Sequence, residues 1–154
     1  MTKLTAREYE VDDFITIQLS EVELLNQIGQ PIEEWGEYHR RHGMAVTVED
    51  PAGEIVFCFG VHHKWTGVGE VWAVYSPLVQ KYAMSLRLTQ SFLKTLEEQF
   101  GYYRLYATVD IRFPETVRFV EKLGFEAEGL MRRHGPHGED RMMYALVKEN
   151  EDAG

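Results

Sequence analysis

The fold is decided by residues 70–88, EVWAVYSPLVQKYAMSLRL, because this stretch holds a strand, a turn and the start of a helix in direct succession. Residues 70–76 are mainly β-branched, aromatic or small apolar, which favours a strand. Residues 84–100 carry leucine and phenylalanine at helical spacing, which predicts the longest helix of the chain. Residues 103–109 alternate as a further strand. Two strands joined through a helix are typical of a parallel β-α-β unit.

The same analysis extends to the rest of the chain and predicts the order β, α, α, β, β, β, α, β, α, β, β. Upstream we expect strands at 4–8, 44–49 and 54–62. We expect helices at 14–28 and 31–43, with Asp12 and Asp13 capping the first of them. A turn at 64–69 would separate the strand at 54–62 from that at 70–76. Downstream we expect a helix at 114–123 and two strands at 125–131 and 141–148, which a loop over 132–140 joins as a hairpin.

This order predicts an α/β fold: one domain over residues 1–148 with a mixed, mostly antiparallel sheet, helices on both faces, and a flexible tail at 149–154. The net charge of −9 argues against nucleic-acid binding, and it suits either a cationic substrate, a basic protein partner or simple solubility. No apolar run reaches membrane-spanning length, and the N-terminus lacks a secretory signal. We therefore expect a cytoplasmic protein. The single cysteine, Cys58, lies in a predicted core strand.

The turn at 77–85 is a candidate anion site. Backbone N–H groups at a helix N-terminus point toward an anion, and the helix dipole adds to their attraction. Ala83 and Ser85 are small enough to let phosphates approach, whereas Tyr82 and Met84 are bulky. An anion-binding turn and an ordinary helix start both remain open.

Two motifs carry a family resemblance. Pro77 is followed at a fixed distance by Gln80, Ala83 and Ser85, and further on comes EKLGF at 121–125. This spacing resembles the GNAT N-acetyltransferases, whose phosphate loop has Arg or Gln followed by two small residues. The resemblance implies acetyl-CoA as co-substrate. It implies a binding site formed by Ala73, Val74, Gln80, Lys81, Tyr82, Ala83, Met84 and Ser85.

The resemblance also implies direct acyl transfer to a primary amine. Glu70 lies where a family base often lies, although it also fits a solvated charge. The tyrosine that often protonates the thiolate falls on Val120, so Tyr75 is the candidate acid, with packing as the alternative. Trp35 and Tyr38 fall in the region that lines the acceptor pocket.

Several family positions are changed, and this supports a second hypothesis. Both loop glycines are replaced, and Val120 has no proton to give. The chain also resembles GNAT-like internal virion proteins of short-tailed bacteriophages. The alternative is therefore a catalytically lapsed structural or assembly protein, located in a virion, with a protein partner or self-association through Trp65 or Tyr102.

The remaining polar groups give weaker signals. Six histidines lack a metal-ligand pattern, so we expect no metal site. His62 and His63 are adjacent and should point to opposite faces of a strand. Asp110 fits a cap or turn residue, and residues 132–134 fit either a solvated loop or a basic contact for an acidic group.

Overall fold

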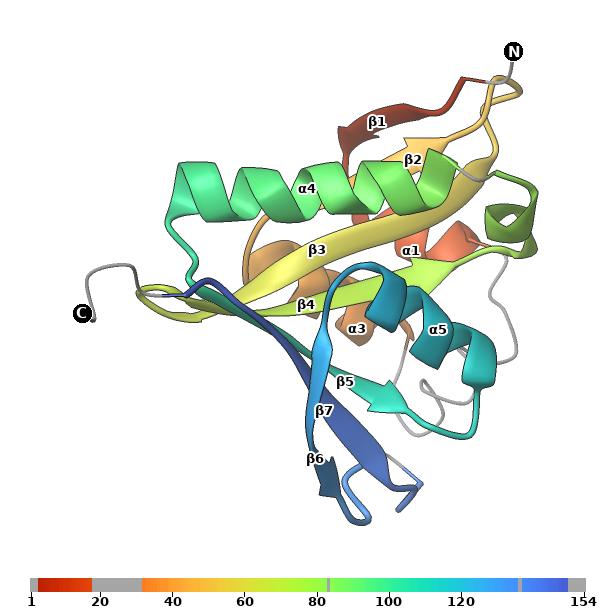
Figure 1. Cartoon of the computed structure of the whole chain (residues 1–154). Coiled ribbons are helices and arrows are strands. Elements are labelled where there is room, and N and C mark those ends of the chain that lie inside the picture. Colours follow the sequence, from red (N-terminus) through yellow and green to blue (C-terminus); the bar gives the residue numbers. More distant parts are fainter. Residues whose placement is uncertain (1–2, 18–31, 83, 136, 150–154) are drawn as a thin grey trace. The chain divides into compact units, whose positions relative to one another are not determined.

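The computed structural model describes residues 3–17, 32–82, 84–135 and 137–149 (Figure 1). Its strands pair in the order β1-β2-β3-β4-β5-β7-β6, which is a mostly antiparallel sheet flanked by helices, as predicted. Along the chain the elements are β1 (Thr5–Glu8), α1 (Val11–Thr16), α3 (Ile32–Arg41), β2 (Ala45–Glu49), β3 (Ile55–Trp65), β4 (Val68–Tyr75), the 3-10 helix η1 (Pro77–Lys81), α4 (Met84–Phe100), β5 (Arg104–Asp110), α5 (Pro114–Lys122), β6 (Glu126–Met131) and β7 (Arg141–Val147).

The chain forms two compact units. The first contains residues 1–62 and 71–88, and the second contains residues 63–70 and 89–154.

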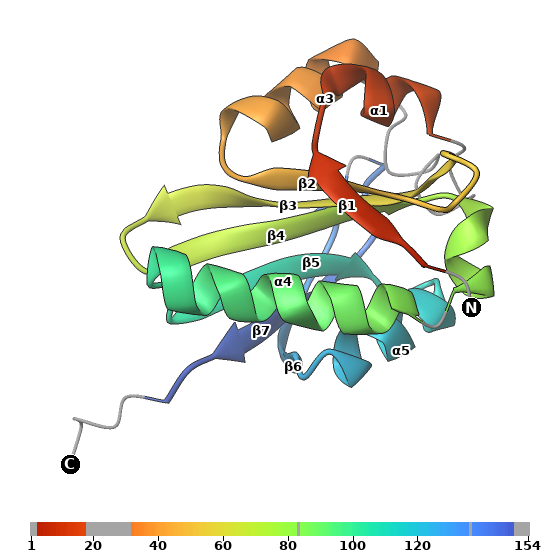
Figure 2. The same ribbon diagram turned by 90° about the horizontal axis from the view of Figure 1, so that it is seen from above.

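In the first unit, β1, β2 and β3 pair antiparallel, and α1 and α3 lie together on one side of them (Figure 2). The apolar side chains between these layers form the core, because their burial removes them from water. Its members are Tyr9, Phe14, Ile17, Cys58 and Val74, with Trp35, Ala45, Ile55 and Trp72 packed against them. The predicted core position of Cys58 is confirmed, since it is fully buried.

Helix α1 begins earlier than predicted. Its first residue is Val11 instead of Phe14, because the carboxylate of Asp13 reaches back to accept a hydrogen bond from the Glu10 N–H at 2.8 Å. The prediction that Asp12 and Asp13 precede the helix is therefore wrong, since both lie in its first turn. Beyond residue 17, the predicted helix at 14–28 lies outside the described residues, as does Pro31 at the start of the next one.

The buried Asp13 carboxylate connects α1 to two strands. It accepts hydrogen bonds from the Arg7 guanidinium at 2.9 and 2.7 Å and from the Thr47 hydroxyl at 2.8 Å. Burial raises the pKa of Asp13, but the hydrogen bonds from Arg7, Glu10 and Thr47 outweigh it, so the pKa is lowered overall. The carboxylate therefore stays ionised and holds β1, α1 and β2 together.

In the second unit, β7 pairs antiparallel with β5 and β6, and residues 68–70 of β4 pair in parallel with residues 104–106 of β5. Helix α5 packs near β5 and ends in a Schellman motif. The Gly124 N–H donates to the Glu121 carbonyl at 3.0 Å, and the Phe125 N–H donates to the Val120 carbonyl at 3.3 Å. Gly124 has a φ of 101°, which favours glycine at this position. Phe125, the next residue, is buried. These two requirements account for the Gly-Phe pair after the helix.

The turn between β3 and β4 is shorter than predicted. The strands extend to Trp65 and from Val68, so Thr66 and Gly67 replace the predicted turn over 64–69. Gly67 has a φ of 85°, and the Tyr103 ring packs so closely over it that a Cβ would clash at 1.9 Å. Lys64 and Glu70 then pair across the turn at 3.0 Å. Glu70 is consequently the third residue of β4, not its first.

Removing the Arg7 side chain should destabilise the first unit. In Arg7→Ala, the buried Asp13 carboxylate loses its cationic partner but keeps its hydrogen bonds to Thr47 and Glu10, so we expect the free energy of unfolding to fall by about 2 kcal/mol. Urea denaturation measures this loss. Arg118→Ala, which removes an exposed arginine from α5, should stay within about 0.5 kcal/mol of the unmodified protein. Equal effects of the two variants would contradict a structural role for the network.

Candidate functional site

The connection from β4 to α4 contains the predicted anion-binding turn. It starts at the buried Ser76, whose hydroxyl donates to the Val56 carbonyl at 3.0 Å and accepts from the Leu78 N–H at 3.2 Å. These bonds start the short helix η1, after which Tyr82 is extended and α4 begins at Met84. The first part of the turn is thus a 3-10 helix, because Ser76 and Pro77 together favour one at this position.

The predicted cofactor-binding residues of this turn differ in accessibility. Gln80, Lys81 and Met84 are exposed, and Tyr82 is half-buried. Ser85 is buried, and its N–H donates to the Tyr82 carbonyl at 3.0 Å. Ala83 lies outside the described residues. Ser85 would therefore act by its backbone and small size, and the exposed groups around it would meet a ligand.

Tyr82 is directed toward the turn between β2 and β3. Its hydroxyl donates to the Asp50 carboxylate at 3.2 Å, and Asp50 is itself fixed because it accepts from the backbone N–H groups of Ala52 and Glu54. Desolvation raises the pKa of Tyr82, and the nearby carboxylates of Asp50 and Glu54 raise it further. Met84, the second bulky residue, is 41% exposed. Neither side chain is buried within the turn.

The charge at the start of α4 suits an anion. The first turn of the helix contains no acidic residue, so no carboxylate neutralises the positive end of the helix dipole. Its first backbone N–H groups lack carbonyl partners within the helix, and Lys81 and Arg87 supply exposed cations on either side. The Asp50 carboxylate opposes these cations. The arrangement can bind phosphate mainly through backbone donors.

The two predicted pantetheine-binding residues lie on β4. Ala73 is half-buried, whereas the Val74 side chain is buried in the core of the first unit. Val74 can thus contact a ligand only through its backbone, which is the kind of contact that the family resemblance implies.

The two predicted catalytic residues belong to different units. Glu70 belongs to the second unit, where Lys64 holds its carboxylate at 3.0 Å. Burial raises the pKa of the neighbouring Tyr106, and the charge of Glu70 adds to that shift. Tyr75 belongs to the first unit and packs against Phe57, with ring centroids 6.3 Å apart.

A buried histidine pair was not predicted from the sequence. His39 Nδ1 lies 2.9 Å from His62 Nε2, and the His39 ring stacks on Trp72 with a centroid distance of 3.8 Å. Burial, together with the charge of His62, lowers the pKa of His39 to about 3. The helical spacing of Trp35 and His39 indicates that they share a helix face, but it does not indicate that His39 meets His62.

Trp35 and Tyr38, the predicted acceptor-site residues, border this pair. Trp35 stacks near His39 at 5.8 Å between centroids, and Tyr38 contacts His62 edge-on at 4.8 Å. His63 has a different partner, the Tyr102 hydroxyl at 2.9 Å in the second unit. The prediction that His62 and His63 point differently is consistent with these separate contacts.

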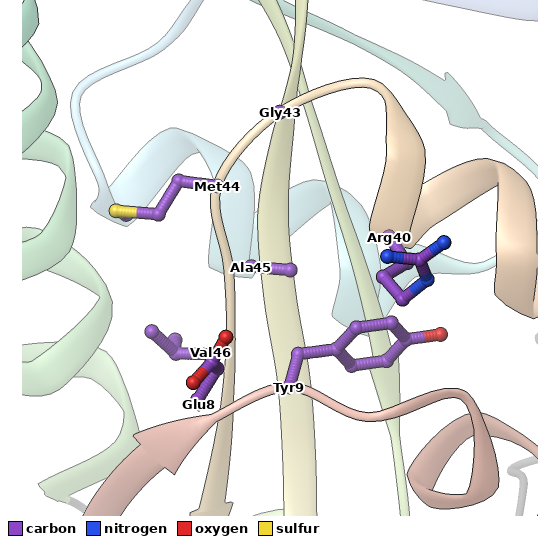
Figure 3. Close-up of a pocket in the computed structure, with 7 residues that line it drawn as sticks. All are labelled: Glu8, Tyr9, Arg40, Gly43, Met44, Ala45 and Val46. Carbon is purple, nitrogen blue, oxygen red and sulfur yellow. The ribbon is translucent and has the colours of Figure 1, made fainter.

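A hollow of about 380 Å³ opens where α3 leads into β2 (Figure 3). It is lined by Glu8, Tyr9, Arg40, Gly43, Met44, Ala45 and Val46. Tyr9 is fixed because its hydroxyl donates to the Gly36 carbonyl at 3.0 Å, and Arg40 pairs with Glu37. Because Arg40 is already paired with Glu37, its guanidinium is not free to bind a ligand in the hollow.

Within the described ranges, no group of three or more His, Cys, Asp or Glu side chains could hold a metal ion. None of the helices in the described part of the chain has the length and apolar character of a membrane span.

Comparison with solved structures identifies the fold as that of the GNAT acetyltransferases. Similar structures include a GNAT-family acetyltransferase from Bacillus anthracis, with a TM-score of 0.75, 19% identity and 96% of each chain covered. A spermidine N-acetyltransferase SpeG chimera from Vibrio cholerae and hSSAT has a TM-score of 0.75 and 16% identity, covering 94% of this chain and 95% of that one. A protein assigned as a phosphinothricin N-acetyltransferase has a TM-score of 0.76 and 17% identity, covering 96% and 100%. No family model and no curated protein matches the sequence.

The His39–His62 pair should make stability depend on pH. His39 takes up a proton near its ordinary pKa of 6.5 when unfolded but only near 3 when folded, so acidification favours the unfolded state. The stabilisation is complete above pH 6.5 and decreases as pH falls. Between pH 7 and pH 5 we expect a loss of about 2 kcal/mol.

Urea denaturation at several pH values measures this loss. His39→Gln keeps a hydrogen-bonding side chain but cannot titrate, so its stability should depend less on pH over the same interval. An unchanged slope in His39→Gln would contradict this origin of the pH dependence.

Proposed function

We propose that the protein is an acyl-CoA-dependent N-acyltransferase that transfers an acyl group, acetyl in the simplest case, directly to a primary amine. The observation that carries the proposal is the turn at the end of β4, which leads into a helix start without acidic residues in a GNAT fold. We infer that it acts in the cytoplasm.

In this proposal, CoA phosphates bind the turn that contains Gln80, Lys81 and Tyr82 and the first backbone N–H groups of α4. Lys81 adds an exposed positive charge. The pantetheine arm pairs with the backbone of β4 around Ala73 and Val74. CoA supplies the acyl group as a thioester. The small side chains at Ala83 and Ser85 favour close approach of the phosphates to the backbone.

The chemistry needs a neutral amine. The amine nitrogen forms a bond to the acyl carbon, the C–S bond breaks, and the amine loses a proton to a base. Glu70 is our candidate base, with Lys64 as the group that positions its carboxylate. The thiolate leaves either unprotonated or with a proton from Tyr75. Since Val120 is buried and has no acidic proton, it cannot supply the acid.

A cationic acceptor suits the charge of this chain. The net charge of −9 attracts amines, which are protonated in solution at neutral pH. One similar structure is of a spermidine N-acetyltransferase, which is consistent with an amine acceptor. Trp35 and Tyr38 would contact the acceptor, because aromatic faces attract cations.

A second candidate is a protein with this fold that has lost catalysis and serves in assembly. Two observations favour it. Val120, which has no acidic proton, stands where the family often has a tyrosine. Lys64 forms an ion pair with Glu70, the candidate base. A phage origin of such a protein remains a hypothesis from the sequence. This candidate predicts no turnover of acetyl-CoA with any amine.

Binding of acetyl-CoA tests the proposed site. Isothermal titration should give a micromolar dissociation constant, and Lys81→Glu should weaken binding about tenfold because it places a carboxylate beside the phosphates. Lys81 is exposed, so the substitution tests binding, whereas a charge at the buried Ser85 would test folding. Lys148→Glu is the matched control, since it makes the same charge change at another exposed position. No binding at millimolar acetyl-CoA, or equal weakening by both variants, would reject the site.

Turnover tests the role of Glu70. With an amine acceptor found by screening, Glu70→Gln should lower kcat/KM by about a hundredfold or more while the affinity for CoA stays unchanged. Glu98→Gln, on the exposed face of α4, serves as control. If Glu70→Gln retains full activity, another group must accept the proton.

A further inference from the structure

The candidate base Glu70 already holds a primary amine, and that amine belongs to this chain. The Lys64 Nζ lies 3.0 Å from a Glu70 carboxylate oxygen, and the two side chains are 28% and 26% exposed. A base that serves acyl transfer to an amine must first remove a proton from a hydrogen-bonded ammonium. Lys64 therefore has the position relative to Glu70 that the proposed reaction requires of its acceptor.

Two neighbouring groups restrict the Lys64 side chain. Besides its ion pair with Glu70, its ammonium donates a hydrogen bond to the Tyr106 hydroxyl. Tyr106 lies opposite Glu70 in the parallel pairing of β4 with β5, and the Arg104 guanidinium lies over its ring, 5.5 Å from the ring centroid. The amine is thus held by groups from two strands, and a reacting group held in this way loses little further freedom when it reacts.

A second lysine–glutamate pair in the described part of the chain lacks these constraints. Lys94 and Glu98 lie one turn apart on α4, with 3.8 Å between Lys94 Nζ and Glu98 Oε1, and their side chains are 75% and 63% exposed. A small acylating reagent in solution should favour the more exposed Lys94. An acyl group delivered to Glu70 should favour Lys64. The two pairs therefore distinguish a directed acylation from a random one.

We propose that Lys64 is a self-acylation site, at which acyl-CoA bound to the protein transfers its acyl group to the chain's own amine. The inference rests on the proposed function, which brings an acyl group to an amine that Glu70 deprotonates. Lys64 is such an amine, since only 3.0 Å separates its nitrogen from the Glu70 carboxylate.

The transfer uses groups that are already in contact. The Glu70 carboxylate takes one proton from the Lys64 ammonium, the neutral nitrogen forms a bond to the acyl carbon, and the C–S bond breaks. The nitrogen loses a second proton as the amide forms. That proton neutralises the departing thiolate, and Glu70 returns the first proton to water. Acylation removes the positive charge of Lys64, so the ion pair is lost and the Glu70 carboxylate becomes available to an external ammonium.

Peptide mass spectrometry tests the proposal after the full chain is incubated with acetyl-CoA. We expect an acetyl group at Lys64 to form at least about tenfold faster than at Lys94, because general-base catalysis contributes about a hundredfold or more. The rate constant should not depend on the protein concentration, since the transfer is intramolecular. The N-hydroxysuccinimide ester of acetic acid, which does not need the CoA site, should instead favour Lys94.

A matched pair of variants tests the role of Glu70. Glu70→Gln should slow acetylation of Lys64 by acetyl-CoA about a hundredfold, because the amide cannot accept the proton. Glu98→Gln removes the carboxylate of the exposed pair and should leave acetylation of Lys64 unchanged. Thermal unfolding of both variants shows that each is folded under the conditions of the assay.

The outcomes separate this inference from the proposed function. If acetyl-CoA binds and is turned over with an amine found by screening while Lys64 stays unmodified, the inference fails and the proposed function stands. Equal rates at Lys64 and Lys94, or an undiminished rate in folded Glu70→Gln, also overturn the inference. Absence of both acetyl-CoA binding and turnover rejects the proposed function, and self-acylation with it.

Discussion

The parallel pairing of β4 with β5 is the constraint on which the proposed site depends. Two parallel strands cannot be joined by a tight turn, so the chain must cross over between them. Here η1 and the 17-residue α4 make the crossover. The start of α4 consequently follows the carboxyl end of β4. The positive end of a helix dipole is placed there by the connectivity, before any side chain is considered.

Side chains near this turn then determine what can reach it. Ser76 is buried and accepts a hydrogen bond at the start of η1. The Tyr82 hydroxyl donates to Asp50, and the Ser85 side chain is buried. Along β4, Val74 and Trp72 contribute to the core of the first unit. The groups left for a ligand are mainly backbone atoms together with exposed side chains such as Lys81. The proposed phosphate site would not require glycine at positions 83 and 85, because backbone donors depend on the path of the chain more than on residue identity.

The sequence predicted the elements whose signals are local. Helix α4 has the predicted bounds because its apolar spacing is regular, and Gly124 ended α5 because a left-handed residue favours glycine. The predictions failed where a tertiary contact decides. Lys64 lies in β3 and Glu70 in β4, and both strands extend into the turn that the sequence predicted over residues 64–69. The His39–His62 contact joins residues 23 apart in the sequence, which no periodicity within one element can reveal.

The central claim is that the turn from Ser76 to Ser85 binds the phosphates of CoA through its backbone. The most direct measurement follows the backbone amide resonances of the labelled protein by NMR while CoA is added. The account predicts that the largest shifts occur at the amides of the turn and the first turn of α4, and that pyrophosphate alone shifts the same amides. Shifts confined to other regions, or no shifts at millimolar CoA, would contradict it.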